Sequence, residues 1–226
     1  MKILVIDVGG TNVKVLASGQ KTPIKIPSGS KMTARKMVNL VREATIKWRY
    51  EAVSIGFPGP VIANRPMREP HNLGDGWVHF DFHRAFGRPT KVVNDAAMQA
   101  LGSYSKGRML FLGLGTGLGS AIVFDGVVEP MELAHLPYKK GRTYEDYVGQ
   151  RGLDRYGKKR WRKEVLDVVE RLQGAFEVDD VVVGGGNARL LKGLPKGLPK
   201  GVRIGDNENA FAGGFRLWDK DRRAGR

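Results

Sequence analysis

The sequence contains no cysteine. The missing thiols exclude disulfide bonds, thiolate zinc sites and a cysteine nucleophile, so nothing in the chain points to an oxidising compartment. Long apolar runs are also missing. The run Ile3 to Ile6 is shorter than the roughly 7–15 apolar residues of a signal peptide, and no later stretch approaches the roughly 20 that cross a bilayer. We therefore expect a soluble, cytoplasmic protein with no membrane partner.

Acidic residues are few relative to basic ones. The 226 residues include 38 Lys and Arg against 23 Asp and Glu, a formal net charge of +15 at pH 7. A field of this sign attracts nucleic acid, anionic membrane and polyphosphate alike, and it selects none of them by itself. The hydrophobic content of 41% is enough for a core, so we expect one large domain or two small ones.

Strands and helices are predicted to alternate along the chain. The predicted strands are 2–8, 13–17, 53–57, 91–93, 109–114, 120–124 and 181–183, and the predicted helices are 33–49, 96–103, 158–176 and 207–218. A glycine turn joins two strands at 9–12 and again at 113–119, whereas the repeated Gly-Leu-Pro-Lys of 193–200 predicts a surface loop. This pattern predicts an α/β protein of two similar lobes with a boundary near residues 106 and 107.

The first glycine turn, Asp7-Val8-Gly9-Gly10-Thr11, has the composition of a phosphate-binding loop. Glycines let backbone N–H groups and the Thr11 hydroxyl approach phosphate oxygens, Lys14 adds a positive charge, and Asp7 suits a water-bridged Mg²⁺. An ordinary tight turn is the alternative. Neither glycine turn has the Walker spacing, and the second leads into a predicted strand where a dinucleotide-binding loop would open a helix.

Taken together, the motifs resemble the sugar kinases of the actin-like ATPase superfamily, and more narrowly the ROK family (repressors, open reading frames and kinases). The resemblance covers essentially the whole chain and rests on the order of six motifs: residues 7–11 with Lys14, 56–60, 94–96, 115–119, 132–135 and 184–187. It implies a two-lobed actin-like ATPase (ribonuclease H-like) fold with a cleft between the lobes. Residues 1–107 plus 206–226 would form the small lobe, closed by a C-terminal helix, and residues 108–205 the large lobe.

The resemblance also implies roles for particular residues. Asp95, which follows Asn94, would be the catalytic base, and phosphoryl transfer does need one carboxylate to accept the hydroxyl proton. Capping of the following helix is an alternative that is compatible with catalysis. The sugar would contact Gly59, Asn72, Asn94, Glu132, His135 and Glu145. The phosphate donor would contact Asp7, Gly9, Gly10, Thr11, Asn12, Lys14, Gly115, Thr116, Gly117, Gly185 and Gly186, with Mg²⁺ held by Asp7 through water.

Two departures from the family pattern stand out. Ala134 occupies a position where the family usually has glycine, within the segment Glu132 to His135. Many members hold a structural zinc with one histidine and three cysteines, and because this chain has no cysteine we predict no zinc site. His79 and His83 have the spacing of a metal pair, but surface or packing histidines are more typical of such a segment.

Residues 132–149, 158–162 and 205–218 are similar to the polyphosphate glucokinases within the family. This similarity implies D-glucose as acceptor, inorganic polyphosphate as a donor, ATP as a possible second donor, and glucose 6-phosphate as product. Residues 139–163 contain ten Lys or Arg against three acids, which suits a chain of phosphates. We call the following set the basic strip: Lys139, Lys140, Arg142, Lys158, Lys159, Arg160 and Arg162, with Lys192, Lys196, Lys200 and Arg203 as an extension. A solvated helix face is the ordinary alternative.

Two other functions fit parts of the sequence. An ATP-dependent ROK kinase for another hexose, such as mannose or fructose, would differ only in pocket geometry, which a linear sequence does not display. A sugar-sensing regulator would need a DNA-binding segment before the first glycine motif, and this motif begins at residue 7. We therefore expect no nucleic-acid partner, and we expect a homodimer because homodimers are common in the family.

Overall fold

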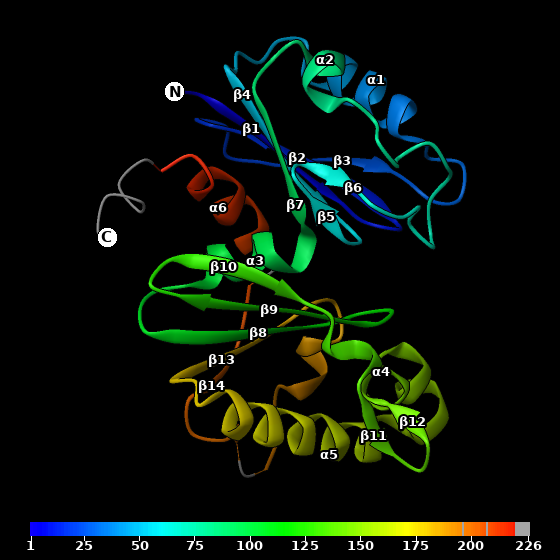
Figure 1. Cartoon of the computed structure of the whole chain (residues 1–226), viewed down its shortest axis with the longest axis vertical. Helices are drawn as coiled ribbons and strands as arrows, with labels where there is room; N and C mark the ends of the chain where they lie inside the picture. The colour runs from blue at the N-terminus through cyan, green and yellow to red at the C-terminus, as the bar shows by residue number, and fades with distance from the viewer. Residues whose placement is uncertain (196, 207, 220–226) are drawn as a thin grey trace. The chain divides into compact units, whose positions relative to one another are not determined.

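The computed structural model describes residues 1–195, 197–206 and 208–219, and the chain folds as two compact units (Figure 1). Unit 1 comprises Met1–Met98 and the chain from Ala210 onward, and unit 2 comprises Gln99–Asn209. The sequence placed the corresponding boundaries near 107 and 206, and the assignment of these parts to a small and a large kinase lobe stays a prediction.

Unit 1 is built on a five-stranded mixed sheet in the order β3-β2-β1-β4-β7. Strands β1, β2 and β3 are antiparallel neighbours, whereas β4 and β7 continue the sheet parallel to β1. Its elements are β1 (Ile3–Val8), β2 (Asn12–Ala17), β3 (Ile24–Pro27), α1 (Ala34–Ala44), β4 (Ala52–Phe57), the hairpin β5 (Val61–Ile62) and β6 (Arg65–Pro66), α2 (Phe82–Phe86) and β7 (Thr90–Asn94).

Unit 2 repeats this topology in a second sheet, ordered β10-β9-β8-β13-β14. Here β8, β9 and β10 are antiparallel, and β13 and β14 are parallel to β8. The elements are β8 (Arg108–Leu114), β9 (Leu118–Phe124), β10 (Val127–Met131), the 3₁₀ turn η1 (Leu133–His135), the hairpin β11 (Pro137–Lys139) and β12 (Arg142–Thr143), α4 (Tyr144–Val148), α5 (Gln150–Phe176), β13 (Asp180–Gly184), the 3₁₀ turn η2 (Ala188–Leu191) and β14 (Val202–Ile204). The division between the units falls within α3 (Asp95–Ser103) and at the start of α6 (Asn209–Arg216).

Strand β1 buries side chains on both of its faces, which explains its continuous apolar run. Leu4 and Ile6 are fully buried in the cluster that includes residues of α1. Val5, on the opposite face, packs in a second cluster with Met98 of α3 and Phe211 of α6. A central strand of a sheet that is covered on both faces is expected to have this composition.

The core of unit 2 is formed by the sheet and α5. Leu110 and Leu112 of β8 and Trp161 of α5 are almost completely buried in one cluster. The indole Nε1 of Trp161 donates a hydrogen bond to the backbone oxygen of Val148 at 2.9 Å, so the buried polar atom is satisfied.

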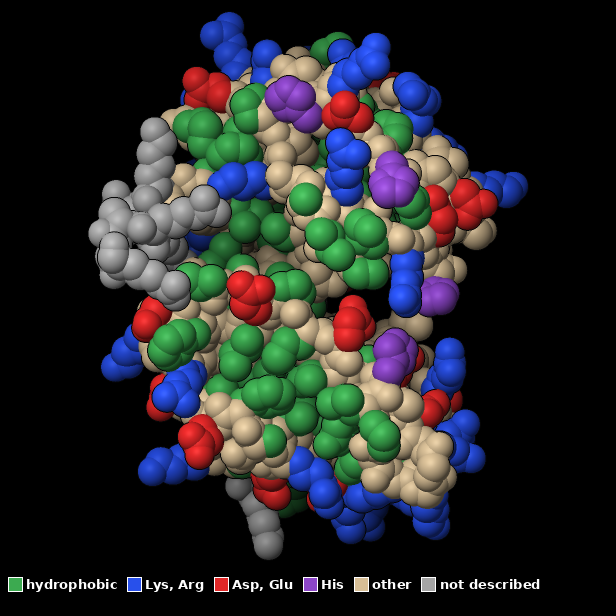
Figure 2. Space-filling view, viewed as in Figure 1, with side chains coloured by type: hydrophobic (Ala, Val, Ile, Leu, Met, Phe, Trp, Pro, Cys, Tyr) green, Lys and Arg blue, Asp and Glu red, His purple; other side chains and the backbone are tan. Residues whose placement is uncertain are grey.

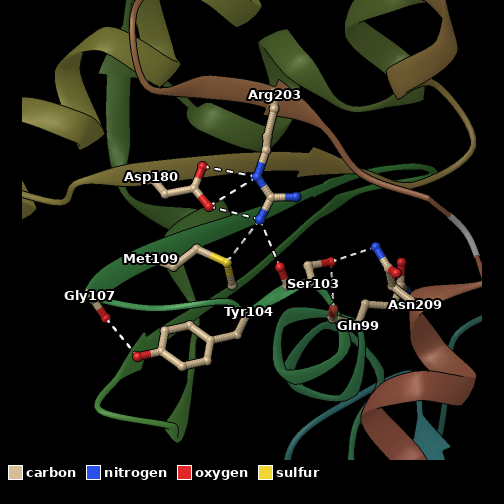
Figure 3. A network of polar contacts seen from close by, with 8 residues as sticks. All are labelled: Gln99, Ser103, Tyr104, Gly107, Met109, Asp180, Arg203 and Asn209. Carbon is tan, nitrogen blue, oxygen red and sulfur yellow. Dashed lines mark hydrogen bonds and ion pairs between the residues drawn. The ribbon is translucent and has the colours of Figure 1, made fainter.

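A network of polar contacts connects the end of α3 to β13 and β14 in unit 2 (Figure 3). The guanidinium of Arg203 lies 2.8–3.1 Å from the carboxylate of Asp180 and 2.7 Å from the backbone oxygen of Ser103. The Asn209 side chain donates to the Ser103 hydroxyl at 2.9 Å. Arg203 was predicted to extend the basic strip. Its guanidinium group instead links β14 to β13 and α3.

Most predicted elements form, with changes at their ends. The predicted helix 33–49 ends at Ala44, because the backbone N–H of Ile46 turns back to the oxygen of Glu43 and the Thr45 hydroxyl bonds the oxygen of Val41. The predicted helix 158–176 begins earlier, at Gln150, and has a kink at Gly157 with φ 69° and ψ 161°. The sequence missed the short elements β3, β5, β6, β10, β11, β12, β14, α2 and α4.

The last predicted helix, 207–218, corresponds to α6, and its first residue lies outside the described residues. Residues 193–200 form no helix or strand at the positions that the structure describes, as expected for a loop. None of the helices within the described ranges has the length and apolar character needed to cross a membrane.

Close packing of α6 on β1 gives a test of the fold. A Cβ at Gly214 would lie 2.3 Å from a methyl carbon of Val5, whereas a Cβ at Gly174, in α5, would meet nothing within 4 Å. We expect Gly214→Ala to lower the free energy of unfolding by about 1–3 kcal/mol through overpacking. Gly174→Ala should raise it by about 0.5–1 kcal/mol through helix propensity. Chemical denaturation of both variants measures this, and equal stability of the two would contradict the packing.

Candidate functional site

The candidate residues of unit 1 gather at one edge of its sheet. Strands β1, β4 and β7 are parallel, and their register pairs Asp7 with Gly56 and Phe57 with Asn94. The glycine turn after β1, the segment after Phe57 and Asp95 after β7 therefore all leave the sheet at its carboxyl edge. Ligands of open α/β sheets typically bind outside this edge.

The first glycine turn is a tight hairpin that is fixed by Ser28, the residue directly after β3. The N–H of Gly9 donates to the oxygen of Asn12 at 3.1 Å, and the Ser28 hydroxyl donates to the oxygen of Gly9 at 2.6 Å. A Cβ at Gly9 would lie 2.9 Å from the Asn12 oxygen, so a side chain is excluded there. The turn thus has tight hairpin geometry, which fits both alternatives, and the phosphate-binding role of its residues stays a prediction. Thr11 at its tip is exposed.

Asp7 and Lys14 face each other across β1 and β2. The two residues are paired in register, and the Lys14 ammonium lies 3.4 Å from the Asp7 carboxylate, whose side chain is only 13% exposed. Burial raises the pKa of Asp7, and the nearby Lys14 charge lowers it in part. The single Lys14 charge does not fully offset the burial of this carboxylate. The carboxylate therefore suits a further cation that binds together with a ligand.

Asn94 and Asp95 both cap α3. The Asn94 side-chain oxygen accepts from the N–H groups of Ala96 at 2.9 Å and Ala97 at 3.2 Å, and the Asp95 carboxylate accepts from the N–H of Ala96 at 2.8 Å. The capping alternative is therefore confirmed, and the catalytic role of Asp95 stays a proposal. The Asn94 amide also donates to the oxygen of Gly59 at 3.1 Å, which brings two of the predicted sugar-binding residues together.

Asn72, another predicted sugar ligand, lies beside the glycine turn instead. A Cβ at Gly10 would lie 3.0 Å from the Cβ of Asn72. Asn72 is exposed, and it reaches this place on the irregular segment between β6 and α2. A predicted sugar-binding residue thus lies beside a predicted donor-binding residue.

The second and third glycine motifs meet at the carboxyl edge of the unit 2 sheet. Gly184 of β13 is in register with Gly113 of β8. The N–H of Asn187 donates to the oxygen of Leu114 at 3.0 Å, and its side chain donates to the oxygen of Gly115 at 3.3 Å. The second and third glycine motifs are about seventy residues apart in the sequence. Parallel pairing of β8 with β13 places them side by side.

Glu145 is held directly over the second glycine turn. Its carboxylate accepts the N–H of Leu118 at 3.3 Å, and a Cβ at Gly117 would lie 2.1 Å from the same oxygen. Glu145 is in α4, which has a capping box between Thr143 and Asp146. The N–H of Thr143 lowers the pKa of Asp146 by hydrogen bonding to its carboxylate. A predicted sugar ligand and a predicted donor-binding glycine are therefore in contact.

Glu132 and His135 flank η1 and are both exposed. The buried Ser120 hydroxyl fixes this segment, since it donates to the oxygen of Met131 at 2.7 Å and accepts from the N–H of Leu133 at 3.2 Å. Ala134, the departure from the family pattern, is 3% exposed, so its methyl group packs in the core.

A cavity of about 540 Å³ opens beside the third glycine motif. It is lined by Gly185, Gly186, Asn187, Ala188, Arg189, Lys192, Ile204, Gly205 and Asp206. The sequence predicted the two glycines, whereas Arg189 and Asp206 were missed because they follow the motif in η2 and after β14. The cavity combines glycine backbone with two basic side chains and one acidic side chain, so its lining has a net positive charge that suits an anionic ligand.

The basic strip is divided by its contacts. Lys and Arg side chains gather over the α5 end of unit 2 in Figure 2, but several of them are bound by other groups of the protein. Lys139 and Arg160 form ion pairs with Glu164. Arg142 donates to the Tyr156 hydroxyl, and Arg162 donates to the backbone oxygens of Leu190 and Lys192. Lys140, Lys158 and Lys159 are exposed and have no ion pair within the described ranges.

No cluster of three or more His, Asp or Glu side chains suited to a metal is found in the part of the chain that the structure describes. The predicted absence of zinc rests on composition and stays a prediction. His79 is exposed and has a left-handed backbone, with φ 57°, and His83 lies exposed on α2.

The duplicated sheet, the glycine hairpin at the edge of each copy and the helix that follows β7 define the class of fold, which is that of the actin-like ATPase sugar kinases. Among solved structures, the chain is similar to an inorganic polyphosphate/ATP-glucomannokinase from Arthrobacter sp. strain KM, with a TM-score of 0.79 and 25% identity over 94% of this chain and 96% of that one. The predicted α/β fold is confirmed.

The chain belongs to the ROK family, whose sequence model matches residues 3–129. It is similar to a polyphosphate glucokinase of Mycobacterium leprae (strain TN), with 25% identity over 206 residues that make up 81% of this chain and 63% of the relative. It is also similar to an N-acetylmannosamine kinase of Salmonella newport (strain SL254), with 28% identity over 142 residues, 56% of this chain and 48% of the relative. The chain thus matches less than two thirds of the length of either protein.

The environment of Asp7 gives a test of the site's electrostatics. Asp7→Asn removes a buried charge whose folded-state pKa is raised, so we expect the free energy of unfolding at pH 7 to increase by roughly 0.5–2 kcal/mol. The gain should begin to shrink as pH falls through that raised pKa and should disappear below the ordinary pKa of 3.8, where the wild-type carboxyl is protonated in both the folded and the unfolded state. Thermal unfolding at several pH values measures it. Asp75→Asn, at an exposed position, is the control, and a less stable Asp7→Asn at pH 7 would refute the assignment.

Proposed function

We propose that the chain is a glucokinase that transfers a phosphoryl group from inorganic polyphosphate, and also from ATP, to the 6-hydroxyl of D-glucose. The observation that carries the proposal is the shared carboxyl edge in unit 1, where the glycine turn after β1 and Asp95 after β7 leave the same side of the sheet. One edge thus presents a phosphate-binding backbone and a carboxylate base.

In this mechanism Asp95 accepts the proton of the sugar hydroxyl as its oxygen attacks the terminal phosphorus and the donor's bridging oxygen leaves. A base at the first residue of a helix is held in position, because a hydrogen bond from the Ala96 N–H fixes its carboxylate. Asn94, Glu132, His135 and Glu145 orient the sugar by hydrogen bonds to its hydroxyl groups.

The donor is held by the glycine backbones, Thr11, Lys14 and Thr116. A Mg²⁺ ion fits Asp7 through water, since the buried carboxylate carries more negative charge than Lys14 offsets, and bound Mg²⁺ would spread the charge of the phosphoryl group. Polyphosphate as donor is supported by the relatives' names and by the exposed lysines of the basic strip. We further propose a homodimer located in the cytoplasm.

A second acceptor class is favoured by one comparison. The Salmonella relative is named for N-acetylmannosamine, which differs from glucose at carbon 2. Discrimination between such sugars depends on hydrogen-bonding groups in the pocket.

A coupled assay for sugar phosphate, with polyphosphate or ATP as donor and glucose, mannose, fructose or N-acetylmannosamine as acceptor, tests the function. We expect turnover of glucose with both donors, and a loss of about 10²–10⁴-fold in kcat for Asp95→Asn. The amide keeps the capping oxygen, so the melting temperature should stay the same. No turnover with any pair would refute the proposal, and a near wild-type rate for Asp95→Asn would refute the base.

The basic strip gives a second test, on the donor. We expect the double substitution Lys158→Gln and Lys159→Gln to raise KM for polyphosphate by about three- to tenfold and to flatten its dependence on salt, because fewer counterions are released. KM for ATP should not change. A matched control removes two exposed lysines of unit 1, Lys21→Gln and Lys36→Gln. An equal effect of both double variants would show a general charge effect and contradict a role for the strip.

A further inference from the structure

A second cavity lies in unit 1, at the edge of the sheet opposite the candidate site. Its volume is about 440 Å³, within the usual range for small-molecule sites. It is lined chiefly by three arginines and three aromatic residues: Arg42, Arg49, Arg88, Trp48, Tyr50 and Phe86. We call it the arginine pocket. Its residues precede the first residues of β4 and β7, whereas Asp95 follows the last residue of β7.

The positive charge of the arginine pocket is not balanced by the protein. No acidic side chain lines it, and none of its arginines has an ion pair within the described part of the chain. Arg42 and Arg88 reach only backbone oxygens, of Ala85 at 3.5 Å and of Gly87 at 3.3 Å. Guanidinium groups bind phosphate oxygens through paired N–H donors, so the pocket suits a phosphate-bearing ligand.

The aromatic residues supply flat apolar surface beside these donors. Phe86 is 8% exposed and belongs to the core of unit 1, while Trp48 and Tyr50 are half-buried against that core. The Trp48 backbone N–H bonds the oxygen of Thr45 at 2.8 Å, which fixes the segment. The indole N–H of Trp48 and the hydroxyl of Tyr50 have no hydrogen-bond partner among the described residues, so both remain available to a ligand.

We propose that the arginine pocket binds a nucleoside phosphate, with its base against Trp48 or Tyr50 and its phosphate on Arg49 and Arg88. The aromatic surface distinguishes this ligand from polyphosphate, which has no planar group, and base stacking on aromatic rings is a substantial interaction. The pocket is separate from the donor-binding residues, because it lies at the amino ends of the strands whose carboxyl ends carry the candidate site.

Titration of AMP against tryptophan fluorescence tests this binding without an activity assay. We expect a saturable change that is lost in Trp48→Phe. Trp77 and Trp161 are fully buried, and Trp218 lies outside the pocket with its indole N–H bonded to the Ser54 hydroxyl at 2.8 Å. Calorimetry should show an affinity at least about tenfold lower for the double substitution Arg49→Gln and Arg88→Gln. The control is Arg65→Gln with Arg84→Gln, which removes two exposed arginines outside the pocket and should bind as wild type.

Several outcomes would overturn the proposal: no saturable binding of AMP, equal affinity in the Arg49/Arg88 variant and wild type, or equal affinity for AMP and inorganic phosphate. Circular dichroism of each variant verifies folding. The substituted residues are not among the proposed sugar or donor ligands, so glucose phosphorylation by the Arg49/Arg88 variant remains a separate test of the proposed function.

Discussion

The contact between Gly185 and the end of β8 is the constraint on which the unit 2 site depends. A Cβ at residue 185 would lie 2.3 Å from the oxygen of Leu114, and its φ of +83° favours glycine. Because this approach is possible, the N–H of Asn187 reaches the Leu114 oxygen and its side chain reaches Gln150 at the start of α5. Hydrogen bonds of Asn187 thereby connect the second and third glycine motifs to the first turn of α5.

Unit 1 meets the same constraint with a different glycine. A Cβ at Gly56 would lie 2.3 Å from the terminal carbon of Met98 and 3.5 Å from the Cα of Asp95. The absence of a side chain in β4 therefore lets α3 begin directly at the sheet. In both units the candidate residues lie next to a glycine whose backbone directly contacts another strand or a helix. These contacts are rigid because no side chain that could rotate lies between the two elements.

The sequence predicted the sheets and the ordered motifs because central strands have continuous apolar runs and glycine turns interrupt them. It missed the edge strands β3, β10 and β14, which are short and contain exposed or only half-buried residues, so the apolar pattern is weak. It also could not show that Asn72 lies by Gly10 or that Glu145 lies over Gly117, since tertiary packing of irregular segments determines both. The arginine pocket was missed for the same reason, as its members come from two separate connections.

Net charge proved a poor measure of the charge available to a ligand. Lys139 lies 2.9 Å from Glu164 and 3.1 Å from Asp167, and Tyr138 donates to both acids. Burial alone would raise the pKa of Asp167, but hydrogen bonds from Arg171, Tyr138 and Lys139 outweigh it and lower that pKa to about 2. The stabilisation that this acid contributes is thus present above its ordinary pKa and is lost only as pH falls toward 2. Lys139 keeps the β11–β12 hairpin on α5, so its charge serves the fold, and attraction of a polyanion depends on cations that have no such acid beside them.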